Sequence, residues 1–289
     1  MPNSSVFRDN LLSDKRILVT GGGSGLGLSM TRRFLELGAE VIIASRSYDR
    51  LVEAKKRVAD AMGDEAGSRV HALTVNVRES RSVEELFERI DGELGEVDIL
   101  VNNAAGNFIS PTERLSPRAF DAVLGIVLHG TTYCSLEAGK RWISSGRSGV
   151  ILNVGTTYAE TGSPYVVPSA TAKGGVISLT RSLAAEWGKY GVRVNAVAPG
   201  PFPTEGAWSR LMPDEEIEKE FLSRIPLGRT GEHGELADLA AYLVSDAASY
   251  VTGSVYTMDG GETVFNSGEF SLLDRLTDAE WDVMERKRG

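Results

Sequence analysis

The chain has few of the residues that build covalent or metal-centred sites. Among its 289 residues there is a single cysteine, Cys134, so no internal disulfide can form. The three histidines, His71, His129 and His233, are scattered and lack the spacing of metal ligands. The sequence therefore predicts neither a disulfide framework nor a metal site.

Long apolar runs and an excess of positive charge are also missing. No apolar run approaches the roughly 20 residues that span a bilayer, and residues 1–15 lack the apolar core of a signal peptide. The formal net charge is −9, and phosphate binding depends on a basic face. We expect a cytoplasmic protein that binds neither a membrane nor nucleic acid.

Short β-branched segments alternate with longer amphipathic segments along the chain. We expect strands at residues 17–20, 41–45, 70–75, 99–102, 150–154, 192–198 and 254–258, and helices at 29–37, 51–62, 82–94, 117–144, 170–190 and 235–245. Such alternation predicts an α/β fold: a single Rossmann-like, doubly wound parallel sheet of about seven strands with helices on both faces. We expect one domain over residues 1–289, with a lid-like segment at 200–224 and an extension at 260–289.

Glycines gather between the first expected strand and the first expected helix, where Thr20 is followed by Gly21-Gly22-Gly23-Ser24-Gly25-Leu26-Gly27. Glycines there permit a tight turn and let backbone N–H groups approach a pyrophosphate at the positive end of a helix. A merely flexible turn is the alternative. The position of the loop between strand and helix predicts a dinucleotide site, with Gly21, Gly23, Ser24, Gly25, Leu26 and Gly27 as cofactor-binding residues.

The second expected strand is followed by Arg46. An NAD site usually has a carboxylate at this point for the ribose 2′-hydroxyl, whereas an arginine can pair with a 2′-phosphate. Arg46 therefore indicates NADPH, with a solvated surface arginine as the alternative.

Residues 98–106, Asp-Ile-Leu-Val-Asn-Asn-Ala-Ala-Gly, close the fourth expected strand. Together with the glycine loop they resemble the short-chain dehydrogenase/reductase superfamily. The resemblance implies that Asn103 lies beside the adenosine. An aspartate usually follows the third strand, and its replacement here, Asn76, can still hydrogen-bond an adenine amine. The further cofactor-binding residues that the resemblance implies are Val77, Pro199, Gly200 and Phe202.

The reactive groups of that superfamily are mostly absent. Its Tyr-x-x-x-Lys motif keeps Lys173 but has Ser169 in place of the tyrosine. Its serine is Thr156, and the asparagine of its long helix is Val127. A non-catalytic homologue would look like this, and so would an enzyme whose reactive groups have been rearranged.

Further motifs favour rearrangement. Asn107-Phe108-Ile109-Ser110-Pro111, the segments 157–162 and 166–169, and Ser267-Gly268-Glu269-Phe270 resemble the 2,4-dienoyl-CoA reductase branch, most closely its mitochondrial type. The resemblance implies NADPH-dependent reduction of 2,4-dienoyl-CoA to trans-3-enoyl-CoA in the β-oxidation of unsaturated fatty acids. It also implies a homotetramer.

The same resemblance implies a role for each site residue. Tyr158 and Asn107 would donate to the remote thioester oxygen, Lys173 would bind the nicotinamide ribose, and Ser169 would join the ribose or water network. The expected acyl-CoA contacts are Arg78, Phe108, Ser116 and Arg210.

Several alternatives stay open. Tyr165 is a rival proton donor, Tyr158 could be a loop aromatic, and Asn107 could be a turn residue. The chain could be another enoyl- or 3-ketoacyl-thioester reductase, or a catalytically silent nucleotide-binding protein.

Overall fold

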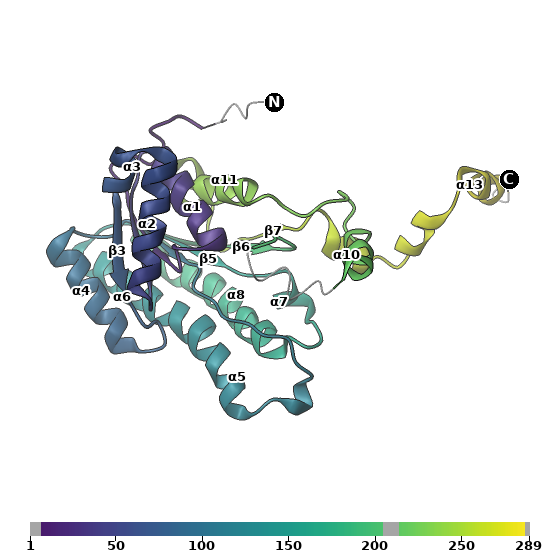
Figure 1. The fold of residues 1–289 in the computed structure, drawn as a ribbon, viewed down its shortest axis with the longest axis horizontal. Helices are drawn as coiled ribbons and strands as arrows, with labels where there is room; N and C mark the ends of the chain where they lie inside the picture. Colours follow the sequence, from purple (N-terminus) through teal and green to yellow (C-terminus); the bar gives the residue numbers. More distant parts are fainter. Residues whose placement is uncertain (1–6, 205–213, 287–289) are drawn as a thin grey trace.

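Seven parallel strands form the centre of the molecule in a computed structural model that describes residues 7–204 and 214–286 (Figure 1). The strand order across the sheet is β3-β2-β1-β4-β5-β6-β7. The bounds are β1 Arg16–Thr20, β2 Glu40–Ser45, β3 Val70–Thr74, β4 Ile99–Asn102, β5 Gly149–Val154, β6 Val192–Pro199 and β7 Val255–Met258.

Helices connect successive strands and cover both faces of the sheet. Their bounds are α1 Gly25–Glu36, α2 Tyr48–Met62, α3 Asp64–Ser68, α4 Ser80–Glu93, α5 Pro117–Leu124, α6 Gly130–Ser145, α7 Tyr158–Thr161, α8 Val167–Trp187, α10 Glu215–Leu222, α11 His233–Val244, α12 Glu262–Ser267 and α13 Asp278–Arg286. Shorter turns are η1 Thr112–Arg114, the π-turn η2 Gly125–His129, η3 Gly188–Tyr190, η4 Asp246–Ala248 and η5 Ser271–Arg275.

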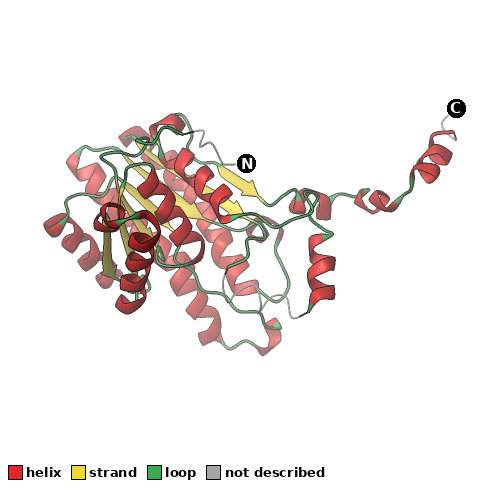
Figure 2. Ribbon diagram, turned by 45° about the horizontal axis from the view of Figure 1, so that its top comes forward, coloured by secondary structure: helices red, strands yellow, loops and turns green. Residues whose placement is uncertain are grey.

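The two faces of the sheet follow from the alternation of side chains along each strand. Ile17 and Val19 of β1 belong to the core cluster that includes side chains of α1, α2 and α11. Leu18, between them, belongs to the cluster with α4, α6 and α8 on the opposite face. All three are fully buried, and each such burial contributes about 2 kcal/mol. Figure 2 shows the resulting layers of helix, sheet and helix.

The strand order reverses direction between β1 and β4. β1 pairs with β2 on one side and with β4 on the other, so the connections leave in opposite directions from this point. In such sheets ligands bind beyond the carboxyl ends of the strands at this reversal. The fold therefore places a binding crevice where Thr20 and Asn102, partners in the parallel register, end their strands.

A buried polar network ties the two central strands to the helices beside them. The amide of Asn102 donates to Ser135 Oγ at 3.1 Å and to Asn153 Oδ1 at 2.9 Å. Asn153 in turn donates to Thr180 Oγ1 of α8 at 2.9 Å. Because unpaired buried amides are costly, these bonds fix α6 and α8 relative to β4 and β5.

The predicted α/β fold and seven-stranded sheet are confirmed, and β4 has the predicted bounds. The helix predicted at residues 117–144 runs from Pro117 to Ser145, and a π-helical segment, Gly125–His129, lies between its parts α5 and α6. Glycines flank this segment: Gly125 lies beside Arg78, and a β-carbon at Gly130 would lie 2.8 Å from Val77. The loop after β3, which carries Val77 and Arg78, thus lies close to the π-helical segment. Apolar periodicity in the sequence does not predict such a segment.

By length and composition alone, Pro117–Ser145 could cross a membrane, the one such helix among the residues that the structure describes. This is weak evidence, because a core helix can meet the same criterion. Its α6 part packs against α4 and α8, and 33% of its most apolar stretch is buried.

The tetramer implied by the family resemblance stays a prediction.

Two segments lie outside the alternation of strands and helices. Residues 200–204 are irregular after β6, and α10 follows within the expected lid at 200–224, of which residues 205–213 lie outside the described part. From residue 260 onward the chain leaves the sheet as α12, η5 and α13, which project from the body (Figure 1). Lid closure stays a prediction.

Two glycines provide a test of how tightly the fold is packed. A β-carbon at Gly149 would lie 2.2 Å from the buried ring of Trp142, whereas one at Gly92 in α4 would meet nothing within 4 Å. We expect Gly149→Ala to lower the free energy of unfolding by about 1–3 kcal/mol through overpacking. Gly92→Ala should raise it by up to about 1 kcal/mol, since alanine favours helix. Urea denaturation measures both, and equal effects would contradict this packing.

Candidate functional site

The glycine loop has the shape of a phosphate cradle. Gly21 and Gly25 have positive φ angles of 68° and 50°, which favour glycine. A β-carbon at Gly27 would lie 2.3 Å from the carbonyl oxygen of Gly21, so a side chain there would fill the space. The loop leads into the free N-terminus of α1, a 12-residue helix. Backbone and helix end therefore fit a pyrophosphate, with Gly23, Ser24 and Leu26 completing the turn.

Asn103 supports this loop from the neighbouring strand. Its amide donates to the carbonyl oxygens of Thr20 at 3.1 Å and Gly21 at 3.2 Å. The hydroxyl of Thr20 accepts the backbone N–H groups of Asn103 and Ala104. Asn103 thus lies at the expected cofactor edge, where it holds the shape of the loop.

The adenosine end of the crevice is formed by the residues after β2 and β3. Arg46 is exposed directly after β2, where an anionic ligand can reach it. Asn76 is half-buried; its backbone N–H donates to Ser82 Oγ, and its side-chain amide donates to Glu79. Val77 is buried beneath Gly130. Binding of the adenosine by Arg46, Asn76 and Val77 stays a prediction.

Residues 199–204 cross the crevice from the other side. Gly200 donates its N–H to the carbonyl of Met258 at 2.9 Å, which fixes the turn after Pro199. The partly buried ring of Phe202 packs against Gly231, which fixes its orientation. Thr204 lies over the glycine loop, with its Cγ2 3.2 Å from the position of a β-carbon on Gly25. Thr204 is not among the predicted site residues, because its place over the glycine loop follows from the fold and not from its spacing in the sequence.

Three predicted reactive side chains come together although they lie far apart in sequence. The hydroxyls of Tyr158 and Ser169 are 3.2 Å apart, and Asn107 Nδ2 donates to the Tyr158 hydroxyl at 3.5 Å. Tyr158 opens the short helix α7 and is half-buried, whereas Ser169 is buried in the first turn of α8. Tyr158 is therefore part of a polar cluster rather than an isolated loop aromatic.

Lys173 lies one helical turn beyond Ser169 on α8. Its Nζ donates to the carbonyl oxygen of Val154 at the end of β5. Burial lowers the pKa of Lys173 to about 8, because the charged form loses its hydration. A lysine held in this way keeps further N–H donors for the hydroxyls of a ribose.

The position where the superfamily has an asparagine brings no polar side chain to the site. Val127 lies in the π-turn, where the superfamily pattern has asparagine, and it is buried. Together with Val123, Ala172 and Val176 it forms a small apolar cluster. The polar side chains of the site are accordingly those around Tyr158 and Asn107.

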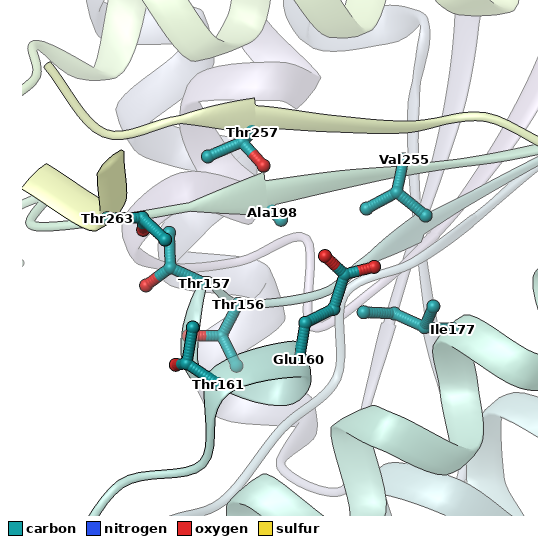
Figure 3. Close-up of a pocket in the computed structure, with 9 residues that line it drawn as sticks. All are labelled: Thr156, Thr157, Glu160, Thr161, Ile177, Ala198, Val255, Thr257 and Thr263. Carbon is teal, nitrogen blue, oxygen red and sulfur yellow. The ribbon is translucent and has the colours of Figure 1, made fainter. Parts of the chain in front are cut away.

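The two alternative oxygen donors occupy different surroundings. Tyr165 is 56% exposed and has a φ of 64°, and its carbonyl accepts the N–H of Ser110. Thr156 lines a hollow of about 30 Å³ between α7 and β7, shown in Figure 3. That hollow has room for one or two waters but not for a nicotinamide or an acyl chain. Neither residue shares the hydrogen bonds of Tyr158 and Ser169.

Of the four predicted acyl-CoA residues, the structure describes Arg78, Phe108 and Ser116, and their role stays a prediction. Phe108 follows Asn107, its side chain is 36% exposed, and its backbone N–H donates to Asn107 Oδ1. Arg78 is exposed beside Gly125, and Ser116 caps α5 by accepting the N–H of Ala119 at 3.2 Å. Arg210 lies outside the described residues. Within the described part, no group of three His, Cys, Asp or Glu side chains could hold a metal ion.

Comparisons with known proteins identify the family of this site. Residues 21–263 match a family model described as enoyl-(acyl carrier protein) reductase. A probable 2,4-dienoyl-CoA reductase 3 [(3E)-enoyl-CoA-producing] of Caenorhabditis elegans is 42% identical over 92% of this chain and 86% of its own length. A probable 2,4-dienoyl-CoA reductase [(2E)-enoyl-CoA-producing] of Bacillus subtilis (strain 168) is 43% identical over 87% of this chain and 97% of its own length.

A solved structure agrees with these relatives. The gluconate 5-dehydrogenase of Burkholderia cenocepacia J2315, in complex with NADP and tartrate, has a TM-score of 0.81 and 31% identity. The match covers 89% of this chain and 98% of that one. The chain therefore belongs to the short-chain dehydrogenase/reductase superfamily, and its similarity within that superfamily is to 2,4-dienoyl-CoA reductases.

Proposed function

We propose that the chain is an NADPH-dependent 2,4-dienoyl-CoA reductase that releases trans-3-enoyl-CoA. The observation that carries this proposal is the cluster of Asn107, Tyr158 and Ser169, which stands in place of a tyrosine at position 169. The similarity to relatives named 2,4-dienoyl-CoA reductases supports the same activity.

The position of the donors suits a conjugated thioester. In a 2,4-dienoyl thioester the carbon that accepts hydride, Cδ, is several bonds from the carbonyl oxygen where negative charge collects. A ketone reductase needs its donor beside the carbon that is reduced. Here the Tyr158 hydroxyl and the Asn107 amide form a separate pair of donors that can face that distant oxygen, in the manner of an oxyanion hole.

Each residue then has one task. NADPH would supply the hydride, the glycine loop and Thr204 would hold its pyrophosphate, and Arg46 would pair with its 2′-phosphate. Lys173 holds the nicotinamide ribose, and Ser169 orients the Tyr158 hydroxyl. Arg78, Phe108, Ser116 and Arg210 hold the acyl-CoA. Addition of hydride at Cδ and of a proton at Cα leaves the double bond between the β and γ carbons.

The first test compares two tyrosines. With NADPH and 2,4-decadienoyl-CoA, Tyr158→Phe should lower kcat by about 10²–10³, the usual cost of one oxyanion donor. Tyr165→Phe, on an exposed loop, should stay within about threefold of the unchanged chain. The reverse ranking would refute the site. A chain that oxidises NADPH with a 3-ketoacyl-CoA or a trans-2-enoyl-CoA, but not with the dienoyl-CoA, would refute the substrate.

The second test concerns cofactor choice. Removal of a charge-assisted pair weakens binding by about tenfold or more, so Arg46→Ala should raise the NADPH KM by that factor and leave the NADH KM nearly unchanged. Arg57→Ala, on the exposed side of α2, is the control and should change neither constant. Undiminished preference for NADPH in Arg46→Ala would remove this residue from the 2′-phosphate site.

The third test uses pH. Lys173 is charged below its pKa of about 8 and neutral above it, so its charge is lost as the pH rises through that value. We expect kcat/KM for NADPH, which reports groups of the free enzyme, to fall with an apparent pKa near 8. In Lys173→Arg the alkaline limb should move upward, because a guanidinium stays charged. A profile that is flat from pH 7 to pH 10 in the unchanged chain would contradict this role.

A further inference from the structure

We propose that His233 is a positioning residue that holds the two cofactor-binding segments, α1 and residues 199–204, in their binding arrangement. His233 is the first residue of α11 and lies between these segments. The proposal deepens the proposed function and rests on it only for the identity of the dinucleotide.

The imidazole of His233 contacts one group on each side. Its Nε2 lies 2.7 Å from the carbonyl oxygen of Pro203, and its Nδ1 lies 3.0 Å from Ser29 Oγ. A carbonyl oxygen can only accept, so Nε2 carries the hydrogen and donates to Pro203. In the neutral ring Nδ1 is an acceptor, and the single hydrogen of the Ser29 hydroxyl can be donated either to Nδ1 or to the Gly25 carbonyl oxygen. Both ring nitrogens therefore lie within hydrogen-bond distance of a partner, which places the ring between the two segments.

These two contacts complete a closed circuit around the phosphate cradle. Ser29 follows Gly25 by one helical turn, and its Oγ also lies 3.3 Å from the Gly25 carbonyl oxygen. On the other side, Pro203 precedes Thr204, whose Cγ2 is 3.2 Å from a β-carbon placed on Gly25. The path Gly25, Ser29, His233, Pro203, Thr204 thus returns to the glycine loop, where the pyrophosphate is proposed to bind.

The remaining parts of both elements have their own supports. Gly200 and Gly231 fix the start of the crossing segment through backbone bonds to Met258 and Pro201. The N-terminus of α11 has a capping box between Glu232 and Glu235, and Arg229 pairs with Glu235. Leu236 and Ala240 bury the helix against the sheet. The His233 ring is therefore placed to fix Pro203 and Thr204 rather than to hold α11 in the fold.

A segment that is already in its binding position loses less freedom when a ligand binds. Loss of the ring should accordingly weaken dinucleotide binding by about five- to tenfold, the range of one neutral hydrogen bond. We expect the substitution of His233 to change the Kd of the nucleotide, and to change it more than substitution of another partly buried histidine does.

The experiment titrates the purified full chain with NADPH and with NADH, without acyl-CoA, and follows nucleotide fluorescence. For the tighter of the two nucleotides, His233→Ala should raise Kd by about five- to tenfold. His233→Gln keeps a donor for Pro203 and should recover part of that loss. Ser29→Ala should have a smaller effect, and adding it to His233→Ala should cause little further loss, because both act through the same contact.

His71 provides the matched control. It is also a partly buried, hydrogen-bonded histidine, with Nε2 2.8 Å from Glu40 Oε1, but it lies on the edge strand β3, beside the first residue of β2. His71→Ala should leave Kd unchanged even if it lowers Tm. An unchanged Kd in His233→Ala, or a loss that His233→Gln fails to relieve, would overturn the proposal. Because no acyl-CoA is present, a chain that binds nucleotide but does not reduce dienoyl-CoA would refute the proposed activity alone.

Discussion

The hydrogen bond between the hydroxyls of Tyr158 and Ser169 joins the two halves of the chemistry. It connects α7, which follows β5, to the first turn of α8, which carries Lys173. The same α8 is held to β5 twice more, through Asn153 to Thr180 and through Lys173 to the Val154 carbonyl. These bonds place a tyrosine hydroxyl against Ser169, one helical turn before the buried lysine, although the tyrosine lies outside α8. The remaining donor, Asn107, approaches from the loop after β4.

Burial has opposite consequences on the two sides of this cluster. Burial lowers the pKa of Lys173, and Val127 belongs to an apolar cluster that brings no polar side chain to the position where the superfamily has asparagine. In front, Asn107 and Phe108 are exposed on a loop where a long thioester can reach them. A site with its donors at the open side can serve an oxygen that is distant from the reduced carbon. This division explains physically how a superfamily scaffold can lose three of four usual groups and keep a reductase activity.

Much of the fold could be predicted from the sequence, because strands such as 99–102 and the glycine loop are marked by apolar runs and punctuating residues. Proximity in the site was harder. The one-turn helix α7 is too short for any helical period, so Tyr158 read equally well as a loop aromatic. Thr204 and His233 acquire their places through contacts with Gly25, Ser29 and Pro203, which lie far away in sequence. Periodicity and spacing carry no information about such contacts.

The position of the transferred hydride tests the account most directly. Reduction of 2,4-decadienoyl-CoA with NADPH deuterated at the transferred position can be followed by NMR and mass spectrometry of the product. Donors placed at the thioester oxygen predict deuterium at the δ carbon, a solvent proton at the α carbon, and a trans double bond between the β and γ carbons. Deuterium at the β carbon, or a product with the double bond next to the thioester, would contradict it.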